Sequence, residues 1–422
     1  MQITIVSKND IKGGAAIAAL RLHKTFRDYS SKLQINSNMR VIFKRSNFEE
    51  VYGEKSYFLK KRISINNKIE RMLQKLQTTS NTNYHSMSFL PSGIQRELNK
   101  SSSQILNIHW VQGGMLSIEE VAKIKKPCVW TLHDAWAYSG SEHYPNGIED
   151  SRFRDGYKKG NKPSKHTRID IDRWCWQRKL KQWQTPFHIV CPSNWLADNA
   201  KQSSLMRGWP IRTIPNPLDT NIFQPRNKKL ARKVFNLPIS KPLLLFAGAR
   251  GTKEVRKGWH LLEKSLKKLK QLNPEIEVVI LGESEPIEKT IYDLPIHYIG
   301  FLTNDKSLSL LYSGVDVVVV PSTMDNLPQI GTEAQSCGVP VAAFDCSGMP
   351  DIVKDKETGY LAKPYDFDEL AYGINWIISN KIMYEEMRIK SRKNALLNWS
   401  PYKVSKEYKK LFDEIIYSQK QI

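Results

Sequence analysis

Three features are scarce in this 422-residue sequence: cysteine, long apolar runs and acidic side chains. The five cysteines are scattered and form no CxxC pair, which argues against a disulfide scaffold or a cysteine-based metal site and favours a reducing cytoplasm. No apolar run is long enough to cross a bilayer. The first residues, MQITIVSKND, become polar after one short apolar stretch, so we expect no signal peptide.

The shortage of acidic residues leaves a strong positive charge. Lys and Arg number 64 against 42 Asp and Glu, a formal net charge of +22. Such a balance predicts an anionic partner, either nucleic acid, a phospholipid surface or a phosphorylated substrate. The charge is concentrated in Lys44–Lys75 and Arg152–Lys181. A solvated surface explains any single lysine. In the second segment, however, the basic residues alternate with Trp174, Trp176 and Trp183, which predicts contact with a membrane interface or with single-stranded nucleic acid.

The order of apolar runs and helix-like segments predicts an α/β protein. Strands such as Ile3–Val6, Ile105–Trp110, Cys128–His133 and Phe187–Cys191 alternate with helical patterns in the first half. The second half repeats this alternation after the Pro-rich segment PNPLDTNIFQP, which is suited to a linker. We therefore expect two doubly wound, Rossmann-like domains that face a cleft, with residues 1–217 in the first and 218–398 in the second.

The most informative stretch runs from Val315 to Asp351. The apolar run VDVVVV ends at Pro321-Ser322, and a polar loop, a helix-like segment and a second apolar strand follow. This order predicts a strand–loop–helix–strand unit of a parallel sheet. Asp325 on the loop and Glu333 inside the helix then lie near the carboxyl ends of the strands, where such sheets bind ligands.

At the start of the chain, the pair Gly13-Gly14 separates the first strand from an Ala- and Leu-rich helix. Glycine lets backbone N–H groups approach a ligand at a helix N-terminus, although a tight turn also needs it. The GxGxxG fingerprint is missing, so dinucleotide binding gains no support.

Five motifs in order resemble the retaining, nucleotide-sugar-dependent glycosyltransferases of family 4, which have the GT-B fold. They are the Gly13-Gly14 loop, TLHD at 131–134, CPSNWLA followed by IPNPLD, RKG at 256–258, and DNLPQIGTEAQSCGVPV from 325. KGGAAIAALRLH and TLHDAWAYSG look most like the branch that builds bacterial exopolysaccharide such as colanic acid, or O-antigen. The resemblance also implies that the final helix, within 399–422, packs back on the first domain.

The resemblance implies a donor site in the second domain. Lys257 matches the family's Lys before Gly, and Arg250 or Arg256 would supply the family's Arg, so these cations would stabilise charge on the departing diphosphate. Asp325 stands where the family has Glu and would contact the donor hexose, with backbone amides of Asn326, Leu327, Pro328 and Gln329 nearby, although proline itself carries no N–H. Glu333 would accept hydrogen bonds from the ribose hydroxyls. An acid offsetting the helix macrodipole would explain Asp325 equally well, but not Glu333.

His133 of the TLHD motif would be the catalytic residue of the first domain by the same resemblance. Its implied role is hydrogen bonding and electrostatics, since the departing phosphate can itself take the acceptor's proton. Asp134 is a candidate to orient its ring. Asp170-Ile171-Asp172 reads as DxD, the metal motif of another glycosyltransferase fold, but Asp172 is better explained as an acid at a helix N-terminus. We expect no metal and no further cofactor; His143 and His166 alone cannot make a zinc site.

The sequence thus predicts transfer of a hexose or N-acetylhexosamine from a UDP- or GDP-sugar to a lipid-diphosphate-linked saccharide, at the cytoplasmic face of an anionic membrane and without nucleic acid. Two alternatives stay open. A sugar-nucleotide epimerase of the same fold would use one substrate and no acceptor. A non-catalytic binder of lipid or nucleic acid would use the positive charge alone.

Overall fold

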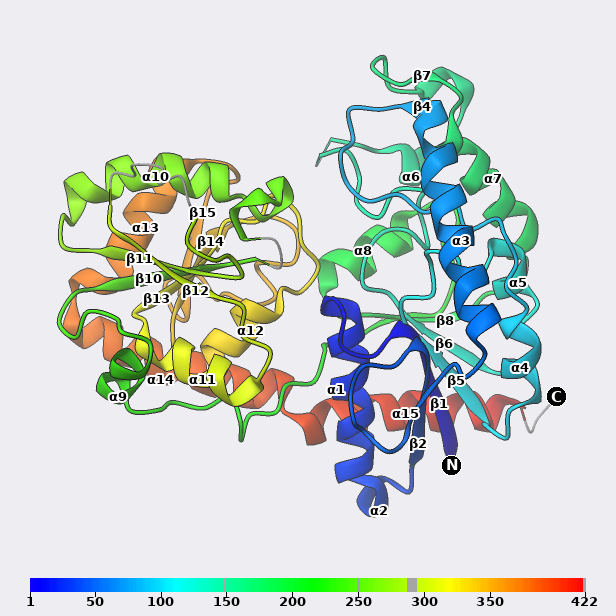
Figure 1. The fold of residues 1–422 in the computed structure, drawn as a ribbon, viewed down its shortest axis with the longest axis horizontal. Coiled ribbons are helices and arrows are strands. Elements are labelled where there is room, and N and C mark those ends of the chain that lie inside the picture. The colour runs from blue at the N-terminus through cyan, green and yellow to red at the C-terminus, as the bar shows by residue number, and fades with distance from the viewer. Residues whose placement is uncertain (148, 249–250, 287–293, 420–422) are drawn as a thin grey trace. The chain divides into compact units, whose positions relative to one another are not determined.

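The computed structural model describes residues 1–147, 149–248, 251–286 and 294–419. The chain divides into two compact units (Figure 1). Unit 1 contains Met1–Pro217 together with the chain from Val404 onward, and unit 2 contains Leu218–Lys403. Arg250, one of the two candidate arginines, lies outside the described residues.

Unit 1 is built on a seven-stranded parallel sheet. Its order is β3-β2-β1-β5-β6-β8-β9. The strands are β1 (Gln2–Asn9), β2 (Asn36–Phe43), β3 (Val51–Gly53), β5 (Ile105–Ile108), β6 (Cys128–Thr131), β8 (His188–Cys191) and β9 (Ile211–Thr213). The helices are α1 (Gly14–Asp28), α2 (Ser30–Leu33), α3 (Tyr57–Leu73), α4 (Ile94–Lys100), α5 (Ile118–Ala122), α6 (Arg152–Asp155), α7 (Ile171–Gln182), α8 (Asn194–Gln202) and α15 (Pro401–Gln419). A two-stranded antiparallel pair, β4 (Gln77–Thr78) with β7 (Thr167–Arg168), lies apart from this sheet.

Successive strand residues supply the two faces of this sheet, because side chains alternate along a strand. Leu106 and Ile108 pack with α3, α4, α5, α7 and α8 on one face. Ile3, Ile5 and Ile105 pack with α1 and α15 on the other. The helix α15 therefore completes the core of unit 1 although the chain reaches it only after unit 2.

Unit 2 has a six-stranded parallel sheet of order β12-β11-β10-β13-β14-β15. Its strands are β10 (Leu243–Ala247), β11 (Glu277–Leu281), β12 (Ile296–Gly300), β13 (Val317–Val320), β14 (Val341–Phe344) and β15 (Gly359–Ala362). Its helices are α9 (Lys228–Val234), α10 (Trp259–Leu272), α11 (Asp305–Gly314), α12 (Gln329–Ser336), α13 (Phe367–Ser379) and α14 (Lys381–Trp399). Separate apolar clusters cover its two faces, with α10 and α13 over one and α11 and α12 over the other. Both units thus have the doubly wound architecture that the alternation predicts.

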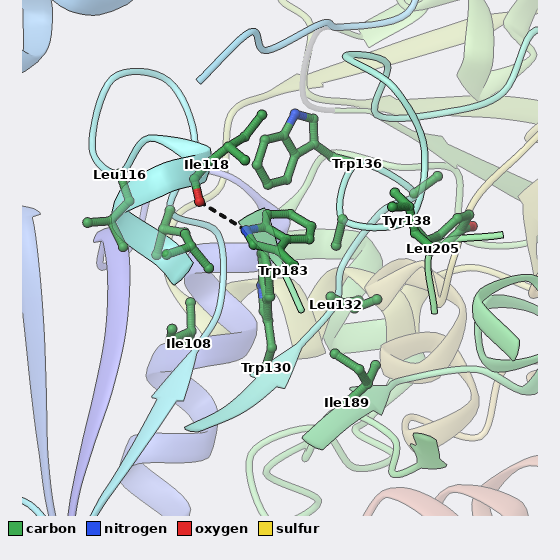
Figure 2. Close-up of a cluster of buried hydrophobic side chains, with 14 of the residues drawn as sticks. Ile108, Leu116, Ile118, Trp130, Leu132, Trp136, Tyr138, Trp183, Ile189 and Leu205 are labelled. Carbon is green, nitrogen blue, oxygen red and sulfur yellow. Dashed lines mark hydrogen bonds between the residues drawn. The ribbon is translucent and has the colours of Figure 1, made fainter. Parts of the chain in front are cut away.

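The second basic segment keeps most of its charged side chains at the surface, but two residues of the predicted basic and aromatic surface, Lys179 and Trp183, are buried. Trp183 is 5% exposed, and its indole N–H donates to the Ile118 carbonyl at 2.9 Å inside the core of unit 1 (Figure 2). Lys179 is fully buried and donates to the carbonyls of Trp136, Ser139 and Gly140. Of the three tryptophans only Trp174 is exposed, at 39%.

The cysteines and the helix lengths can be compared with what the sequence predicted. All five cysteines are buried and free. Within the described ranges, no helix combines the length and the apolar character that a membrane crossing requires.

Candidate functional site

The order of strands in unit 2 locates a ligand site before any side chain is considered. Strands β10 and β13 are neighbours in the sheet. After β10 the chain continues to β11 and β12 on one side of this pair, and after β13 it continues to β14 and β15 on the other side. The loops that follow β10 and β13 therefore diverge and leave a crevice at the carboxyl ends of the two strands. The loop after β10 carries Arg256 and Lys257, and the loop after β13 carries Asp325. The three residues singled out in the sequence therefore come from the two loops that meet at this crevice.

Their side chains form one ionic cluster. Lys257 Nζ donates to Asp325 Oδ2 at 2.6 Å, and Arg256 Nη1 lies 3.1 Å from the same oxygen. The same Arg256 Nη1 donates to the Met324 carbonyl at 2.7 Å. Each cation thus faces the carboxylate that the sequence predicted to bind the donor hexose.

The electrostatic state of Asp325 follows from this geometry. Its side chain is buried, at 7% exposure, and burial by itself raises a carboxyl pKa. Lys257 and Arg256 outweigh burial and lower the pKa of Asp325 to about 2. The group is therefore a carboxylate at neutral pH, and its charge holds both cations at the edge of the sheet.

Close backbone contacts hold the two loops together. Gly258 adopts a left-handed conformation with φ of 77°, and a Cβ atom there would lie 1.7 Å from the Pro321 carbonyl oxygen. Only glycine fits this approach. The Thr323 N–H also donates to the Arg256 carbonyl at 2.9 Å. The RKG motif therefore needs its glycine to bring the cations against the loop after β13.

The helix α12 follows this loop and begins beside Asn326, Leu327 and Pro328, which are buried, while Gln329 is its first residue. Its N-cap is Pro328, and no side chain caps its first turn in the described structure. Uncapped N–H groups and the positive end of the helix dipole favour an anion there. The loop and the helix start therefore offer backbone donors close to the ionic cluster.

Glu333 lies inside α12 and is 5% exposed. Its Oε2 accepts a hydrogen bond from the Tyr312 hydroxyl of α11 at 2.8 Å. Sequence reasoning missed Tyr312, because nothing in the α11 sequence marks this residue as different from an ordinary core aromatic. The tyrosine hydroxyl thus contributes to the orientation of the Glu333 carboxylate.

Unit 1 has a corresponding point between β1 and β5. Gly13 and Gly14 follow β1, and Gly13 caps α1 with φ of 96°. A Cβ atom at Gly13 would meet nothing within 4 Å, so its backbone is open to a ligand. The preceding loop is held by buried Asp10, whose carboxylate accepts the N–H groups of Arg45 and Ser46.

His133 lies two residues after β6, and His109 follows β5 directly. The Nδ1 atom of His109 is 2.8 Å from Nε2 of His133, and the two rings are stacked at a centroid distance of 5.1 Å. Burial lowers the pKa of His133 to about 4, although the nearby Asp134 acts in the opposite direction. The pKa of His109 is also lowered, mainly by burial and to a smaller extent by the neighbouring His133. Both rings are therefore neutral at neutral pH.

Asp134 has other partners than the ring it was expected to orient. Its Oδ2 accepts hydrogen bonds from His143 Nδ1 at 2.7 Å and Trp110 Nε1 at 3.2 Å, and its Oδ1 accepts from the Trp136 N–H. The His133 imidazole contacts His109, which the sequence did not single out. Its position at the end of a buried strand was the available signal.

Comparison with known proteins by sequence finds similarity in unit 2. Residues 227–394 match the model of the glycosyl transferases group 1. The sulfoquinovosyl transferase SQD2 of Arabidopsis thaliana is 31% identical over 179 residues, 40% of this chain and 34% of that protein. A D-inositol 3-phosphate glycosyltransferase of Mycolicibacterium paratuberculosis is 27% identical over 172 residues, 38% and 37% of the two chains. The matched region spans little more than a third of either relative.

Solved structures match the chain over nearly its whole length. Anabaena Alr3699/HepE in complex with UDP and glucose has a TM-score of 0.64 at 14% identity, covering 98% of this chain and 100% of that one. WaaG, a glycosyltransferase involved in lipopolysaccharide biosynthesis, has a TM-score of 0.61 at 11% identity, covering 95% and 98%. At these identities the likeness concerns the fold. The chain has the GT-B fold of two Rossmann-like units, and residues 227–394, in its second unit, are similar to the glycosyl transferases group 1.

Proposed function

We propose that this chain is a retaining glycosyltransferase. It transfers a hexose or N-acetylhexosamine from a UDP- or GDP-sugar to a lipid-diphosphate-linked saccharide, as a step in the synthesis of a bacterial surface polysaccharide such as O-antigen, capsule or exopolysaccharide. Unit 2 binds the donor and unit 1 the acceptor. The observation that carries the proposal is the cluster of Arg256, Lys257 and Asp325 at the carboxyl ends of β10 and β13.

The chemistry of the donor fits this cluster. A sugar nucleotide presents a diphosphate, and the two cations together with the start of α12 offer fixed positive charge to it. As the sugar leaves, negative charge grows on the terminal phosphate, and cations already in place stabilise that charge without reorganisation. We propose that Lys257 and Arg256 supply this stabilisation, so that turnover needs no metal ion at the diphosphate.

The two carboxylates suit the hydroxyl groups of the donor. A carboxylate accepts two hydrogen bonds, and a diol offers two donors. We propose that Glu333, oriented by Tyr312, binds the ribose and that Asp325 binds the hexose while it holds the two cations. The known structures support a nucleotide donor, because Alr3699/HepE was solved with UDP and with UDP-glucose.

His133 fits a role in hydrogen bonding rather than proton abstraction. A neutral ring with a pKa of about 4 is a weak base and is not available as a cation at neutral pH. In retaining transfer the departing phosphate can accept the acceptor's proton. We therefore propose that His133 contributes a neutral donor or acceptor in unit 1, with its ring fixed by His109.

We propose that the protein works at the inner face of an anionic membrane. The exposed face of α3 supports this location, because Phe58, Ile65 and Met72 alternate with Lys61 and Lys68 there, all of them exposed. A helix face of apolar and basic side chains binds the boundary between lipid headgroups and acyl chains. This face replaces the segment around α7, because Trp183 is buried there.

Thermal-shift titration of wild type and Glu333→Ala with UDP, GDP, ADP and their sugars tests the donor site. A ligand that binds only the folded state raises the melting temperature. We expect one nucleotide family to stabilise wild type and to lose this effect in the variant. No shift with any nucleotide at millimolar concentration would overturn the proposal and favour the non-catalytic binder.

A second measurement separates transfer from epimerisation. Wild type is incubated with the stabilising sugar nucleotide, with and without a lipid-diphosphate-linked saccharide, and the sugars are followed by NMR. Product that forms only with acceptor and keeps the donor's anomeric configuration supports retaining transfer. Conversion of the donor alone into a second sugar nucleotide would show an epimerase.

A further inference from the structure

A cluster of histidine and carboxylate side chains lies in unit 1 outside the site described above. His85, Glu142 and Asp172 each direct one potential ligand atom to a common place, with all three atoms within 4.8 Å of one another. His166 and Asp170 form a second such group with the same Asp172. Asp172 therefore joins two groups of metal-ligand type, which come from three segments far apart in the sequence.

The cluster is interior. Glu142 is 4% exposed, Asp172 2% and His166 7%. Glu142 accepts the Tyr157 hydroxyl at Oε1, but its Oε2 has no hydrogen-bond partner among the described residues. His166 Nδ1 likewise has none there, and it lies 3.9 Å from Asp172 Oδ2. Two buried polar atoms are thus left unpaired beside a carboxylate, an arrangement that proteins normally avoid.

The ring of His85 is set up as a ligand. Its Nε2 is 3.3 Å from the Asn81 carbonyl oxygen, which can only accept a hydrogen bond, so Nε2 carries the proton. In the neutral ring Nδ1 then has a lone pair; this atom lies 3.0 Å from the Ser141 hydroxyl oxygen and 3.3 Å from Asp172 Oδ1. A histidine that donates one N–H to a backbone carbonyl and turns its other nitrogen inward is the usual arrangement at metal sites.

Asp172 already accepts hydrogen bonds from the Ser141 hydroxyl at Oδ1 and from the Gln77 amide at Oδ2, whereas Glu142 Oε2 has no donor beside it among the described residues. We propose that the group of His85, Glu142 and Asp172 binds a divalent transition-metal ion. One imidazole and two carboxylates suit Zn²⁺, which takes nitrogen and oxygen ligands, better than Mg²⁺, which prefers oxygen alone.

The ion would have a structural role. The ligands come from the segments before α4, after β6 and at the start of α7, where regular structure is sparse. Strands β4 and β7 share only two residue pairs, and His85 and Glu142 form an isolated bridge. A single ion would hold these segments together in place of a larger apolar core.

The proposed ion is also connected to the loop that carries His133. His143 follows Glu142 directly in the sequence, and the Nδ1 atom of His143 forms a hydrogen bond with Asp134 Oδ2 at 2.7 Å. The Ala135 N–H donates to the His143 carbonyl at 2.9 Å. The metal site would thus fix the chain on either side of His143 and, through Asp134, the loop next to the candidate catalytic histidine.

Metal content and thermal stability test the proposal on the full-length protein. Wild type, Glu142→Gln and Asp155→Asn are incubated with ZnCl₂, passed through a desalting column and assayed by elemental analysis. Asp155 is an exposed acid in the same part of unit 1 and serves as the matched control. We expect about one equivalent of zinc in wild type and in the control, a much lower content in Glu142→Gln, and a melting temperature that EDTA lowers only in the two metal-binding proteins.

A bound proton is the competing explanation. The amide introduced by Glu142→Gln would imitate a protonated glutamate, so the variant would then be as stable as wild type. Equal zinc content in wild type and Glu142→Gln, or wild type that retains no zinc, manganese or magnesium and ignores EDTA, would overturn the proposal. Should the variant fail to fold, Co²⁺ added to wild type decides: visible d–d absorption of four- or five-coordinate cobalt supports the site, and the spectrum of hydrated cobalt overturns it.

Discussion

Lys257 Nζ and Arg256 Nη1 both lie within 3.1 Å of one oxygen atom, Oδ2 of Asp325. A buried carboxylate thus holds two cations in place before any ligand arrives. Such preorganisation is what fixed charge needs in order to stabilise a transition state, because no side chain must then move at the moment of reaction.

We expect Lys257→Ala to reduce turnover by about 10²–10³-fold, the loss typical of one preorganised charge donor. Initial rates with the donor identified by thermal shift measure this effect. Lys253→Ala is the control, since Lys253 is an exposed lysine of the same loop. Equal rates in the two variants would rule out the assigned role of Lys257. Melting temperatures must be recorded as well, because removal of one partner of a buried ion pair also destabilises the fold.

Nucleotide affinity should depend on Glu333 more than on Tyr312. Glu333→Ala removes the proposed ribose acceptor and should weaken binding by about 10–100-fold, as expected for a charged hydrogen bond worth about 1.5–3 kcal/mol. Tyr312→Phe removes only the hydroxyl that orients the carboxylate, so a smaller loss is expected. Isothermal titration with the preferred nucleotide measures both, and Glu386→Ala, an exposed acid on α14, should change nothing. The reverse order of effects would contradict the assignment.

The free energy of unfolding should decrease as the pH is lowered from about 6.5 to about 4, and His133 should contribute to this decrease. Burial lowers the pKa of His133 to about 4 in the folded protein, whereas an unfolded histidine titrates near about 6.5. Within this window the unfolded chain binds more protons, so the free energy of unfolding decreases as the pH decreases, by up to about 1.4 kcal/mol per pH unit for one group. Urea denaturation of wild type and His133→Asn at several pH values measures the slope.

The variant should have a shallower slope between pH 6.5 and 4 by about one proton. A residual slope is expected, because burial also lowers the pKa of His23 to about 4. Identical slopes for wild type and variant would show that His133 titrates normally.

Binding to anionic vesicles should depend on α3. Replacing both Phe58 and Met72 by Ser removes two exposed apolar side chains from the basic face and should weaken binding at least about 10-fold, because each buried side chain of this size contributes about 1.5–3 kcal/mol. Flotation with phosphatidylserine-containing liposomes measures the loss. Ile389→Ser removes a comparably exposed apolar side chain from unit 2 and is the control. Equal flotation of all three proteins would eliminate α3 as the membrane contact.

The buried Lys179 should be essential for the stability of unit 1. Lys179→Met leaves the carbonyls of Trp136, Ser139 and Gly140 without their ammonium donor and should cost about 3–5 kcal/mol. The exposed Lys181 lies two residues further along α7, and Lys181→Met should change the unfolding free energy by less than about 0.5 kcal/mol. Chemical denaturation of both variants distinguishes them.

Sequence reasoning succeeded where apolar runs and loops carry strong local signals. The strand around Val317–Val320, the loop with Asp325 and the helix with Glu333 were predicted from the spacing of apolar and polar residues. Strands β2 and β15 were missed, because NSNMRVIF and GYLA contain polar or small residues that break an apolar run. Local pattern alone does not reveal a strand whose burial comes from its neighbours.

The failures around α7 have a different cause. Trp183 and Lys179 stand in a run of basic residues, and the tryptophans interleaved with these charges indicated an exposed contact surface. The fold instead satisfies the ammonium group with three carbonyls and places the indole in the core. Tyr312 escaped notice for a related reason, since a partner that arrives through tertiary contact leaves no trace in the neighbouring sequence.

The return of α15 to unit 1 has a consequence for how the protein matures. Phe26 on α1 packs against Tyr408 and Phe412, and the Tyr408 hydroxyl lies 3.1 Å from Thr131 Oγ1 of β6. During synthesis unit 2 can therefore fold before unit 1 is complete, since unit 1 must wait until α15 has left the ribosome. Until then the part of the unit 1 core that α15 covers is open to solvent, and this nascent chain is the stage most exposed to aggregation and to chaperones.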